Sequence, residues 1–364
     1  MPTWDALIAG PTALTGRPAH TERHLATQLA ADRRVLFVDP PLFLHDALRR
    51  RAWRDLARRR TEPMADVVEL QPIAPPGLHR PGAPAIARRV VSEQIEREAR
   101  RSLRRPRVVI VSDPRLRTLE GVERDLLVYW QRDLLSADDS ARQAGSIAIG
   151  HEQLLAAADL VVGVTAGLAD LAPEGTARLV VENGCEYDHF ATPVPVAPEL
   201  ARLDGPIIGF LGGVSWRVDV DLLVALAEAD PGRHVALVGE VVVDVPRRAN
   251  LHVFGPRPYA ELPRWTQGFS VGVIPYRVDA FNVASSPLKA YEYLASGVPV
   301  VSTPLPALEG LEPCVRIGSG AGFLAEVDAA IADPPAAEAC RALAAGHDWR
   351  TQVAAFRSAI DTLL

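Results

Sequence analysis

The chain has few cysteines and almost no lysine. Its 364 residues include Cys185, Cys314 and Cys340, which lie far apart and form no CxxC pair or Cys/His cluster. Neither a disulfide framework nor a zinc site is therefore expected, and this usage favours a reducing cytoplasm. Of the 39 basic residues, all but Lys289 are arginine. A single surviving lysine can be chance, so its neighbourhood has to decide whether it has a role.

Several sequence patterns that define large protein classes are also absent. No run of about 18 apolar residues occurs, and the N-terminal MPTWDALIAG lacks the regions of a signal peptide, so we expect a chain that is neither secreted nor membrane-spanning. Neither half has GxGxxG after its first strand or a GxxxxGK[ST] loop, which disfavours dinucleotide oxidoreductases and P-loop NTPases. A net charge of -6 argues against nucleic-acid binding by the whole protein.

Short β-branched runs alternate with longer helical patterns along the whole chain, which is typical of βαβ units and parallel sheets. In the first half we predict strands at 5–10, 34–39, 67–73, 107–113, 126–131, 160–165 and 177–183. In the second half we predict them at 206–212, 234–240, 250–255, 269–276, 298–303 and 314–318. The predicted fold class is α/β, with two doubly wound Rossmann-like domains whose carboxyl edges face one cleft.

The proline-rich stretch 191–205 shows no periodic pattern and is interpreted as an interdomain linker. It divides the chain into an N-terminal domain at 1–190 and a C-terminal domain at 206–346. The last segment, 347–364, is predicted to be a helix that packs back toward the N-terminal domain.

The segment SSPLKAYEYLASGVPVVST, residues 285–303, carries the clearest helix signals. Ser286 suits the N-cap, Pro287 the first helical position, and Gly297 the stop. The N-terminus of such a helix favours a phosphate or diphosphate, and Lys289 would add a full charge. Glu292, three residues on, could accept hydrogen bonds from ribose hydroxyls. The alternative is a plain cap with a Lys289–Glu292 surface pair and no ligand.

Further glycine or polar residues stand at the ends of neighbouring predicted strands. Gly212 and Gly213 precede a helix that should begin near Asp219, with Arg217 before it. Gly239 follows the next strand, and the loop after 250–255 contributes Gly255, Arg257 and Tyr259. Four consecutive loops at one sheet edge are thus suited to a nucleotide.

These segments, in this order, resemble glycosyltransferase family 4, whose members have the GT-B fold. The resemblance rests on GFLGG, NLHVFGPRPYAELP, VGVIPY and SPLKAYEYLASGVPVVST, over about 140 residues. VENGCEYDHF, residues 181–190, is also similar to the hinge motif of that family. Over the first 180 residues the resemblance rests mainly on topology.

The resemblance implies a retaining, metal-independent glycosyltransferase, with the acceptor bound mainly by the N-terminal domain and a nucleotide-diphosphate sugar by the C-terminal one. It implies no cofactor and no metal site. Lys289 and Arg217 would stabilise the leaving diphosphate in catalysis. The donor would contact Gly212, Gly213, Gly239, Gly255, Arg257, Ser285, Ser286, Leu288 and Glu292.

The chain departs from the family pattern at two positions. Ala284 stands where the first glutamate of the E-x7-E motif is expected, with Glu292 as the second, and Pro287 replaces a glycine whose N–H faces the diphosphate. Proline cannot donate that hydrogen bond. Ser285, Ser286 and the amide of Leu288 could substitute, and SPLKxYEYLA resembles a variant branch of the family.

The N-terminal half offers acceptor-binding candidates at two strand ends. Where many members of the family carry a histidine, this chain has YWQRDLL, so Asp133 is the candidate that orients or deprotonates the acceptor, beside Gln131 and Arg132. Asp133 could equally be a helix cap. The other candidates follow the first predicted strand: Gly10, Arg17, His20 and His24. The two histidines, four residues apart, could instead be exposed helix residues.

Basic charge is concentrated between residues 41 and 107, which hold 16 arginines against 8 acidic residues. Within it, ALRRRAWRDLARRR at 47–60 has the composition of a basic amphipathic helix that could lie on an anionic membrane. A solvated helix or a site for an anionic acceptor are the alternatives. Few aromatic residues interleave these arginines, so nucleic acid is not an expected partner.

Two other functions remain open at this point. A nucleotide-sugar 2-epimerase would share the architecture, and a binding subunit without activity would share the nucleotide site. The sequence names neither the base nor the sugar of the donor. Polysaccharide, glycolipid and small-molecule acceptors, including lipid-linked ones, all stay possible.

Overall fold

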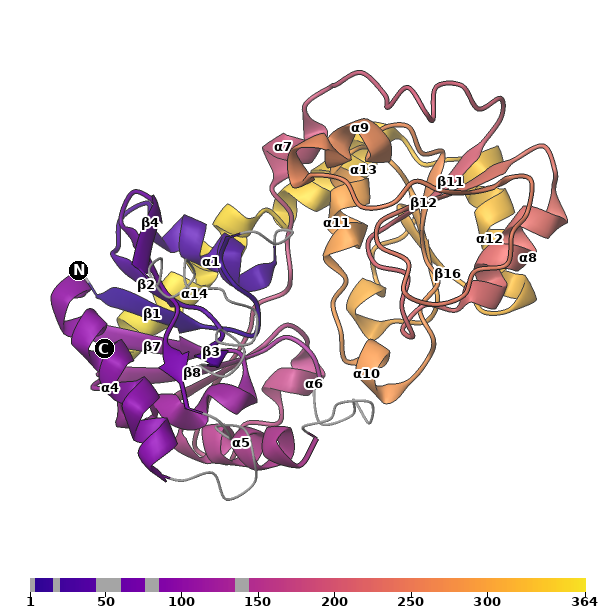
Figure 1. Cartoon of the computed structure of the whole chain (residues 1–364). Coiled ribbons are helices and arrows are strands. Elements are labelled where there is room, and N and C mark those ends of the chain that lie inside the picture. The colour runs from indigo at the N-terminus through magenta and orange to yellow at the C-terminus, as the bar shows by residue number, and fades with distance from the viewer. Residues whose placement is uncertain (1–3, 16–19, 44–59, 76–84, 135–143) are drawn as a thin grey trace. The chain divides into compact units, whose positions relative to one another are not determined.

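The computed structural model describes residues 4–15, 20–43, 60–75, 85–134 and 144–364. The chain forms two compact units (Figure 1). The first unit contains Met1–Val181 and Val353–Leu364, and the second contains Glu182–Gln352. In the part of the chain that is described, no helix is both long enough and apolar enough to span a bilayer.

The first unit is built on an eight-stranded sheet with the order β10-β9-β8-β7-β1-β2-β5-β4. Every pairing in it is parallel except that of β4 with β5, which is antiparallel. The strands are β1 Asp5–Ala9, β2 Val35–Val38, β4 Arg60–Met64, β5 Val67–Leu70, β7 Arg107–Val111, β8 Leu126–Gln131, β9 Leu160–Gly163 and β10 Ala177–Val180. The strand order reverses direction between β1 and β7, and ligands bind at such switch points in open α/β sheets.

The described part of the first unit also contains helices and one small extra sheet. They are α1 Thr21–Leu29, α4 Ala85–Ser102, η1 Pro114–Gly121, α5 Ala144–Ala157 and α6 Ala166–Ala169, together with the strand pair β3 Leu42–Phe43 and β6 Ile73–Ala74. In α4, Val91, Ile95 and Ala99 are fully buried. Their spacing of four residues puts them on one face, which packs on the core of the sheet.

The second unit has a six-stranded, all-parallel sheet with the order β13-β12-β11-β14-β15-β16. Its strands are β11 Ile207–Leu211, β12 His234–Val238, β13 Leu251–Val253, β14 Val271–Ile274, β15 Val300–Ser302 and β16 Val315–Ile317. This is the dinucleotide-fold order, and its switch point lies between β11 and β14.

The helices of the second unit lie before, between and after these strands. They are α7 Tyr187–Ala191, α8 Val220–Ala229, η3 Tyr259–Glu261, α9 Leu262–Thr266, α10 Ala280–Val283, α11 Leu288–Ala295, η4 Pro306–Leu308, α12 Ala321–Ala332 and α13 Ala337–Gly346. The last helix, α14 Trp349–Leu363, begins in the second unit and from Val353 on belongs to the first. There, the ring centroid of Phe356 lies 5.1 Å from that of Trp130 and 6.4 Å from that of Trp4.

All thirteen predicted strands form, with ends trimmed by a few residues. The prediction missed β3, β4 and β6, because two-residue strands leave no periodic pattern and β4, RTEPM, carries a proline and exposed polar residues typical of a sheet edge.

The proline-rich stretch does not form a linker between the units. Residues 191–205 lie inside the second unit, where Ala197 and Leu200 are buried in its core. The amide of Ala197 donates to the carbonyl of Arg264 at 2.8 Å. The prolines prevent regular secondary structure in this stretch, but its apolar side chains are still buried, and its backbone is hydrogen-bonded to helix α9.

Candidate active site

Glycines bring two backbone segments and the side chain of Lys289 close together at the switch point of the second unit. Gly212 follows β11 with φ of +121°, and its amide donates to the carbonyl of Val238 at 2.8 Å. A Cβ built on Gly239 would lie 2.0 Å from the carbonyl oxygen of Gly212, and one on Gly212 would lie 3.1 Å from the Nζ of Lys289. Both positions therefore require glycine, and together they let Lys289 approach the end of β11.

Lys289 reaches this point from the first turn of α11. Its Nζ lies 4.0 Å from the ring centroid of Phe210 and 4.9 Å from that of Tyr276. Phe210 belongs to β11 and Tyr276 follows β14, so the ammonium group lies at the switch point itself. Aromatic faces attract a cation and hold the flexible lysine stem in one place.

Arg217 lies at the same site and, like Lys289, packs against the ring of Tyr276. Its Cζ lies 4.8 Å from the Tyr276 ring centroid and 4.7 Å from that of Phe281. Its Nε donates to Oδ1 of Asn282 at 2.8 Å, and its Nη2 donates to Oγ of Ser285 at 3.2 Å. The structure thus brings Arg217 and Lys289 to one tyrosine ring, with Ser285 hydrogen-bonded to Arg217, and all three are residues that the sequence predicted for this site.

The N-terminus of α11 differs from the prediction. The N-cap is Pro287, and no side chain caps this end. Ser286 is buried, and its carbonyl oxygen accepts a hydrogen bond from Nδ2 of Asn183 at 2.6 Å. The buried amide of Asn183 therefore holds the backbone of the Ser-Pro step, which leaves the first amides of α11, beginning with Leu288, without a side-chain cap.

The predicted end of α11 and the predicted start of α8 are both confirmed. The amide of Gly297, with φ of +80°, donates to the carbonyl of Leu294 at 2.9 Å, and that of Val298 donates to Tyr293 at 3.0 Å, as in a Schellman motif. Asp219 is the N-cap of α8 and accepts a hydrogen bond from the amide of Asp221 at 3.1 Å.

Glu292 lies one turn beyond Lys289 on α11. Burial raises the pKa of its carboxyl group to about 7, the charge of Lys289 lowers it, and the nearby Glu186 raises it. Burial above all raises the pKa of Tyr259, and the charges of Glu292 and Glu186 raise it further. Glu292, Glu186 and Tyr259 therefore form one group of hydroxyl and carboxyl side chains beside Lys289.

Glu292→Gln is expected to stabilise the protein at pH 8. A carboxyl group whose pKa is raised on folding contributes stability below its unfolded pKa near 4.5, and this contribution is lost as the pH rises toward 7. The neutral amide avoids that loss, which is on the order of 2 kcal/mol. Urea unfolding of both proteins at pH 5 and pH 8 measures it. A variant that is no more stable than the wild type at pH 8 would contradict the raised pKa.

Two other predicted donor residues lie on the loop after β13. Gly255 has φ of +73°, and a Cβ added there would have no atom within 4 Å, so its backbone faces open space. The guanidinium of Arg257 lies over the ring of Trp265 at 4.7 Å and forms an ion pair with Glu199 at 3.3 Å. Arg257 thus has partners within the protein, and its contact with a donor stays a prediction.

The switch point of the first unit contains a buried carboxylate that the sequence analysis missed. Glu22 of α1 is 2% exposed and forms an ion pair with Nε of Arg132 at 2.9 Å. Ser112, after β7, donates to Oε1 of Glu22 at 2.5 Å, and Nδ1 of His20 lies 2.9 Å from Oε2. Arg132 and these hydrogen bonds lower the pKa of Glu22 to about 2 against the effect of burial.

Gly10 has a steric role in this cluster. A Cβ built on it would lie 3.0 Å from both Cγ of Glu22 and Oγ of Ser112. Of the predicted acceptor residues, the structure therefore brings Gly10, His20 and Arg132 together around Glu22. The sequence signal that could have revealed Glu22 is its place two residues after His20, in the first turn of the helix that follows β1.

The remaining predictions for the first unit have mixed outcomes. Asp133 follows Arg132 directly, and the two charges interact. Gln131 is buried, and its Nε2 donates to the carbonyl of Leu168 at 3.0 Å, so this amide supports packing. His24 is also buried, not exposed on its helix. Arg17 lies outside the described residues.

A second pair of carboxyl groups holds the loop that follows Gly10. Asp39, after β2, accepts a hydrogen bond from the amide of Leu14 at 3.0 Å, and Glu69 of β5 accepts one from the amide of Thr15 at 3.0 Å. Burial raises the pKa of Asp39 to about 7, and the neighbouring Glu69 raises it as well. Through these two hydrogen bonds, Asp39 and Glu69 fix the loop backbone at the same sheet edge.

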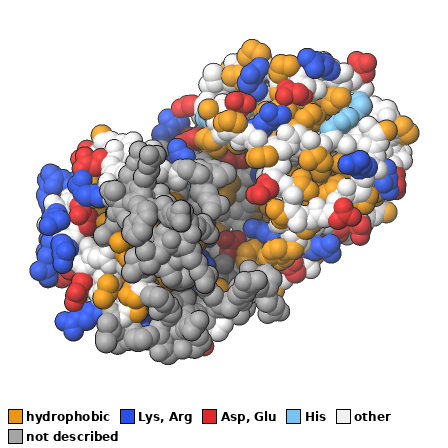
Figure 2. All heavy atoms as spheres, viewed as in Figure 1, with side chains coloured by type: hydrophobic (Ala, Val, Ile, Leu, Met, Phe, Trp, Pro, Cys, Tyr) orange, Lys and Arg blue, Asp and Glu red, His pale blue; other side chains and the backbone are white. Residues whose placement is uncertain are grey.

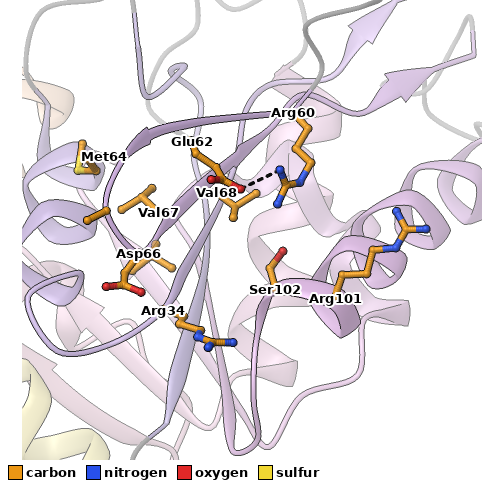
Figure 3. A pocket seen from close by; sticks show the side chains of 11 residues that line it. Arg34, Arg60, Glu62, Met64, Asp66, Val67, Val68, Arg101 and Ser102 are labelled. Atoms are coloured by element: carbon orange, nitrogen blue, oxygen red, sulfur yellow. Dashed lines mark ion pairs between the residues drawn. The ribbon is translucent and has the colours of Figure 1, made fainter.

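A cavity of about 490 Å³ lies at the opposite, amino-terminal edge of the same sheet. Figure 3 shows Arg34, Arg60 and Arg101 around it. Arg60 forms ion pairs with Glu62 at 2.9 Å and with Glu98 at 2.8 Å. The cavity therefore offers an anion little uncompensated charge. Of the arginine-rich segment 47–60, Arg60 begins β4, and the rest lies outside the described residues.

Among the described residues, no group of three or more His, Cys, Asp or Glu side chains is placed to hold a metal ion. No protein-family model matches the chain. Over 141 residues the sequence is 30% identical to TuaH of Bacillus subtilis (strain 168), which is named, provisionally, as a teichuronic acid biosynthesis glycosyltransferase. That alignment covers 36% of this chain and 36% of TuaH, so the chain matches about a third of its curated relative.

Solved structures match over nearly the whole chain. Sucrose-phosphate synthase from Thermosynechococcus elongatus is 17% identical, with a TM-score of 0.69 and coverage of 96% of this chain and 94% of the other. An α,α-trehalose-phosphate synthase (UDP-forming) from Burkholderia xenovorans, in complex with glucose-6-phosphate, is 14% identical, with a TM-score of 0.69 and 99% coverage of both chains. HepE of Anabaena, in complex with UDP and glucose, is 15% identical, with a TM-score of 0.68 and coverage of 98% and 99%. Identities this low establish the fold alone: this chain has the GT-B fold, with two Rossmann-like domains.

Proposed function

We propose that the protein is a glycosyltransferase that moves a sugar from a nucleotide-diphosphate sugar to an acceptor hydroxyl or amine. The observation that carries the proposal is the placement of Lys289 and Arg217, both within 5 Å of the Tyr276 ring, at the switch point of the second sheet. Two cations beside an uncapped helix N-terminus are suited to a diphosphate. HepE, which shares the fold, is described with UDP and glucose, which supports the same ligand class here.

In the proposed reaction, the bond between the anomeric carbon and the diphosphate oxygen breaks, and the electron pair leaves with the nucleoside diphosphate. The acceptor oxygen or nitrogen bonds to the anomeric carbon and loses its proton. Lys289 and Arg217 stabilise the negative charge that develops on the leaving group, without the need for a metal ion. Retention of the anomeric configuration is part of the proposal.

The other proposed donor contacts follow from the geometry of the second unit. Gly212 and Gly213 let the diphosphate approach the backbone, and Ser285 is held beside it by Arg217. Glu292, protonated or ionised near neutral pH, hydrogen-bonds to the ribose hydroxyls.

We place the acceptor at the switch point of the first unit. Asp133 would accept the acceptor proton, and Arg132 fixes its position through their charges. Arg132 is itself held by Glu22. The proposal also includes a cytoplasmic location. It includes peripheral contact of the segment 47–60 with an anionic membrane, and both points rest on sequence composition.

The first experiment measures thermal stabilisation by UDP, GDP, dTDP and ADP, each with and without magnesium. A ligand of the native state raises the melting temperature by mass action. A selective shift identifies the base, and turnover of the matching nucleotide sugar then separates the classes of function. A transferase releases nucleoside diphosphate faster with acceptor, an epimerase interconverts two donors, and a binding subunit does neither. No shift with any nucleotide would contradict the proposal.

Lys289→Ala is expected to weaken binding of the selected nucleoside diphosphate by about tenfold to a hundredfold, since it removes a charged hydrogen-bond donor. Lys289→Arg keeps the charge and should lose less. Arg248→Ala is the matched control, because Arg248 forms an exposed ion pair with Glu228 at 2.6 Å and should leave binding unchanged. Isothermal titration calorimetry measures all three. Wild-type affinity in Lys289→Ala would exclude this diphosphate site.

A further inference from the structure

Aromatic rings and cations form one continuous series through the candidate donor site, which ends in two aromatic rings. We call this series the cation–aromatic ladder; in order, it consists of Phe210, Lys289, Tyr276, Arg217, Phe281 and Trp216. Successive members lie 4.0, 4.9, 4.8, 4.7 and 5.2 Å apart, measured between ring centroids or from a cation to a centroid. The ladder thus connects Lys289 and Arg217, the two cations proposed to bind the diphosphate, to Trp216.

The backbone fixes the outer half of the ladder. The amide of Arg277 donates to the carbonyl of Arg217 at 2.8 Å, which joins the loop after β11 to the loop after β14. Asn282, which has no exposed surface, donates from Nδ2 to that same carbonyl at 3.3 Å. Asp279 caps α10 through the amide of Asn282 at 2.8 Å. Phe281 lies on this capped turn, so the ring against which Trp216 packs is held in place.

Exposure increases sharply at the end of the ladder. Tyr276 and Phe281 are each 7% exposed, whereas Trp216 is 42% exposed. The other tryptophans in the described part of the chain, Trp4, Trp130, Trp265 and Trp349, are buried. Figure 2 shows hydrophobic side chains on the surface of the second unit in the region where Figure 1 places α10. An indole in water beside a rigid ring is a surface that a ligand can cover.

We propose that Trp216 is the platform on which the sugar ring of the donor stacks. This proposal rests on the proposed function, because it takes the diphosphate to lie on Lys289 and Arg217. The sugar is bonded directly to that diphosphate, and Phe281 connects Trp216 to Arg217, since its ring lies 4.7 Å from Cζ of Arg217 and 5.2 Å from the Trp216 ring. One face of a pyranose consists of C–H groups, which suit an aromatic face, while its hydroxyls can stay in water.

A sugar fits this surface better than a lipid chain or a partner protein. The exposed end of the ladder is a single indole that is 42% exposed. Surfaces that bind proteins or lipid chains are contiguous apolar patches of several hundred Å². The donor sugar is therefore the occupant that both the small size of the platform and its connection to Arg217 through Phe281 favour.

The test compares the binding affinities of Trp216→Ala and Trp216→Phe with those of the wild type. Each nucleoside diphosphate is compared with a matching nucleotide sugar: UDP with UDP-glucose, GDP with GDP-mannose, dTDP with dTDP-glucose and ADP with ADP-glucose. We expect Trp216→Ala to weaken binding of the nucleotide sugar about fivefold or more, and to change the affinity for the bare nucleoside diphosphate less than twofold. Trp216→Phe should recover most of the loss. Val253→Ala, which removes another exposed apolar side chain from β13, is the matched control.

Tryptophan fluorescence gives a second readout that folding defects do not mimic. In the wild type, the nucleotide sugar should protect the exposed indole from acrylamide quenching more than the bare nucleotide does, and this difference should vanish in Trp216→Ala. Equal losses for nucleotide and nucleotide sugar, or an effect on the KM for acceptor alone, would overturn the platform and leave the diphosphate site standing. If no nucleotide binds to the wild type, the proposed function itself fails, and the platform with it.

Discussion

Glu22→Ala is expected to destabilise the first unit by about 3–5 kcal/mol, because it leaves the guanidinium of Arg132 buried without its partner. For a unit of this size, that loss lowers the melting temperature by roughly 10 °C. Activity should fall as well, since Arg132 is adjacent to the proposed base Asp133. Differential scanning calorimetry measures the first effect, and turnover of the nucleotide sugar measures the second.

The control for this substitution is Glu93→Ala. Glu93 forms an exposed i,i+4 pair with Arg89 at 2.8 Å, and its loss should cost about 0.5 kcal/mol or less. The two variants differ in burial and not in the chemical change. If both variants lose the same free energy of unfolding, the buried Glu22–Arg132 pair stabilises the protein no more than an exposed pair does.

Acid titration gives the Glu22 prediction an independent signature. A carboxyl group whose pKa is lowered on folding contributes stability above its unfolded pKa near 4.5, and this contribution is lost as the pH falls toward 2. Glu22→Gln cannot ionise, so its stability should depend less steeply on pH between about 4.5 and 2. An unchanged slope would mean that the carboxylate is not paired in solution.

Gly239→Ala is expected to be the most damaging single-methyl substitution in the second unit. Its Cβ would lie 2.0 Å from the carbonyl oxygen of Gly212, which is backbone and cannot rotate away. The end of β11 must shift, and a Cβ on Gly212 would lie only 3.1 Å from Nζ of Lys289, so nucleotide binding should be lost together with about 3 kcal/mol of stability. Thermal unfolding with and without nucleotide measures both losses.

Gly213→Ala is the matched control for stability. The nearest atom to its added Cβ is the carbonyl oxygen of Glu240 at 3.9 Å, an ordinary contact, so stability should change by about 0.5 kcal/mol or less. Its nucleotide affinity reports separately on whether the diphosphate approaches this backbone. Wild-type stability in Gly239→Ala would show that the β11 and β12 ends are not packed as described.

Patterns that are local in the sequence predicted the strands and the fold class. They also predicted that the sheet edge of the second unit suits a diphosphate. The run VLFV of β2 and the apolar Ile207–Leu211 of β11 identify buried parallel strands without help from the rest of the chain. The Schellman end of α11 at Gly297 and the cap of α8 at Asp219 were equally local. In each case a few neighbouring residues fix the backbone, so the sequence alone was sufficient.

The tertiary structure decided which side chains meet. Glu22 and Arg132 are 110 residues apart, and Arg217 and Ser285 are 68 apart, so no local pattern reveals either pair. The proline-rich stretch 191–205 looked like a linker because prolines disrupt periodicity, yet burial of Ala197 and Leu200 draws it into the second unit. Sequence determines the elements through short-range sterics and hydrophobic periodicity, whereas contacts between strand ends depend on sheet order, which places residues that are distant in the chain at one edge.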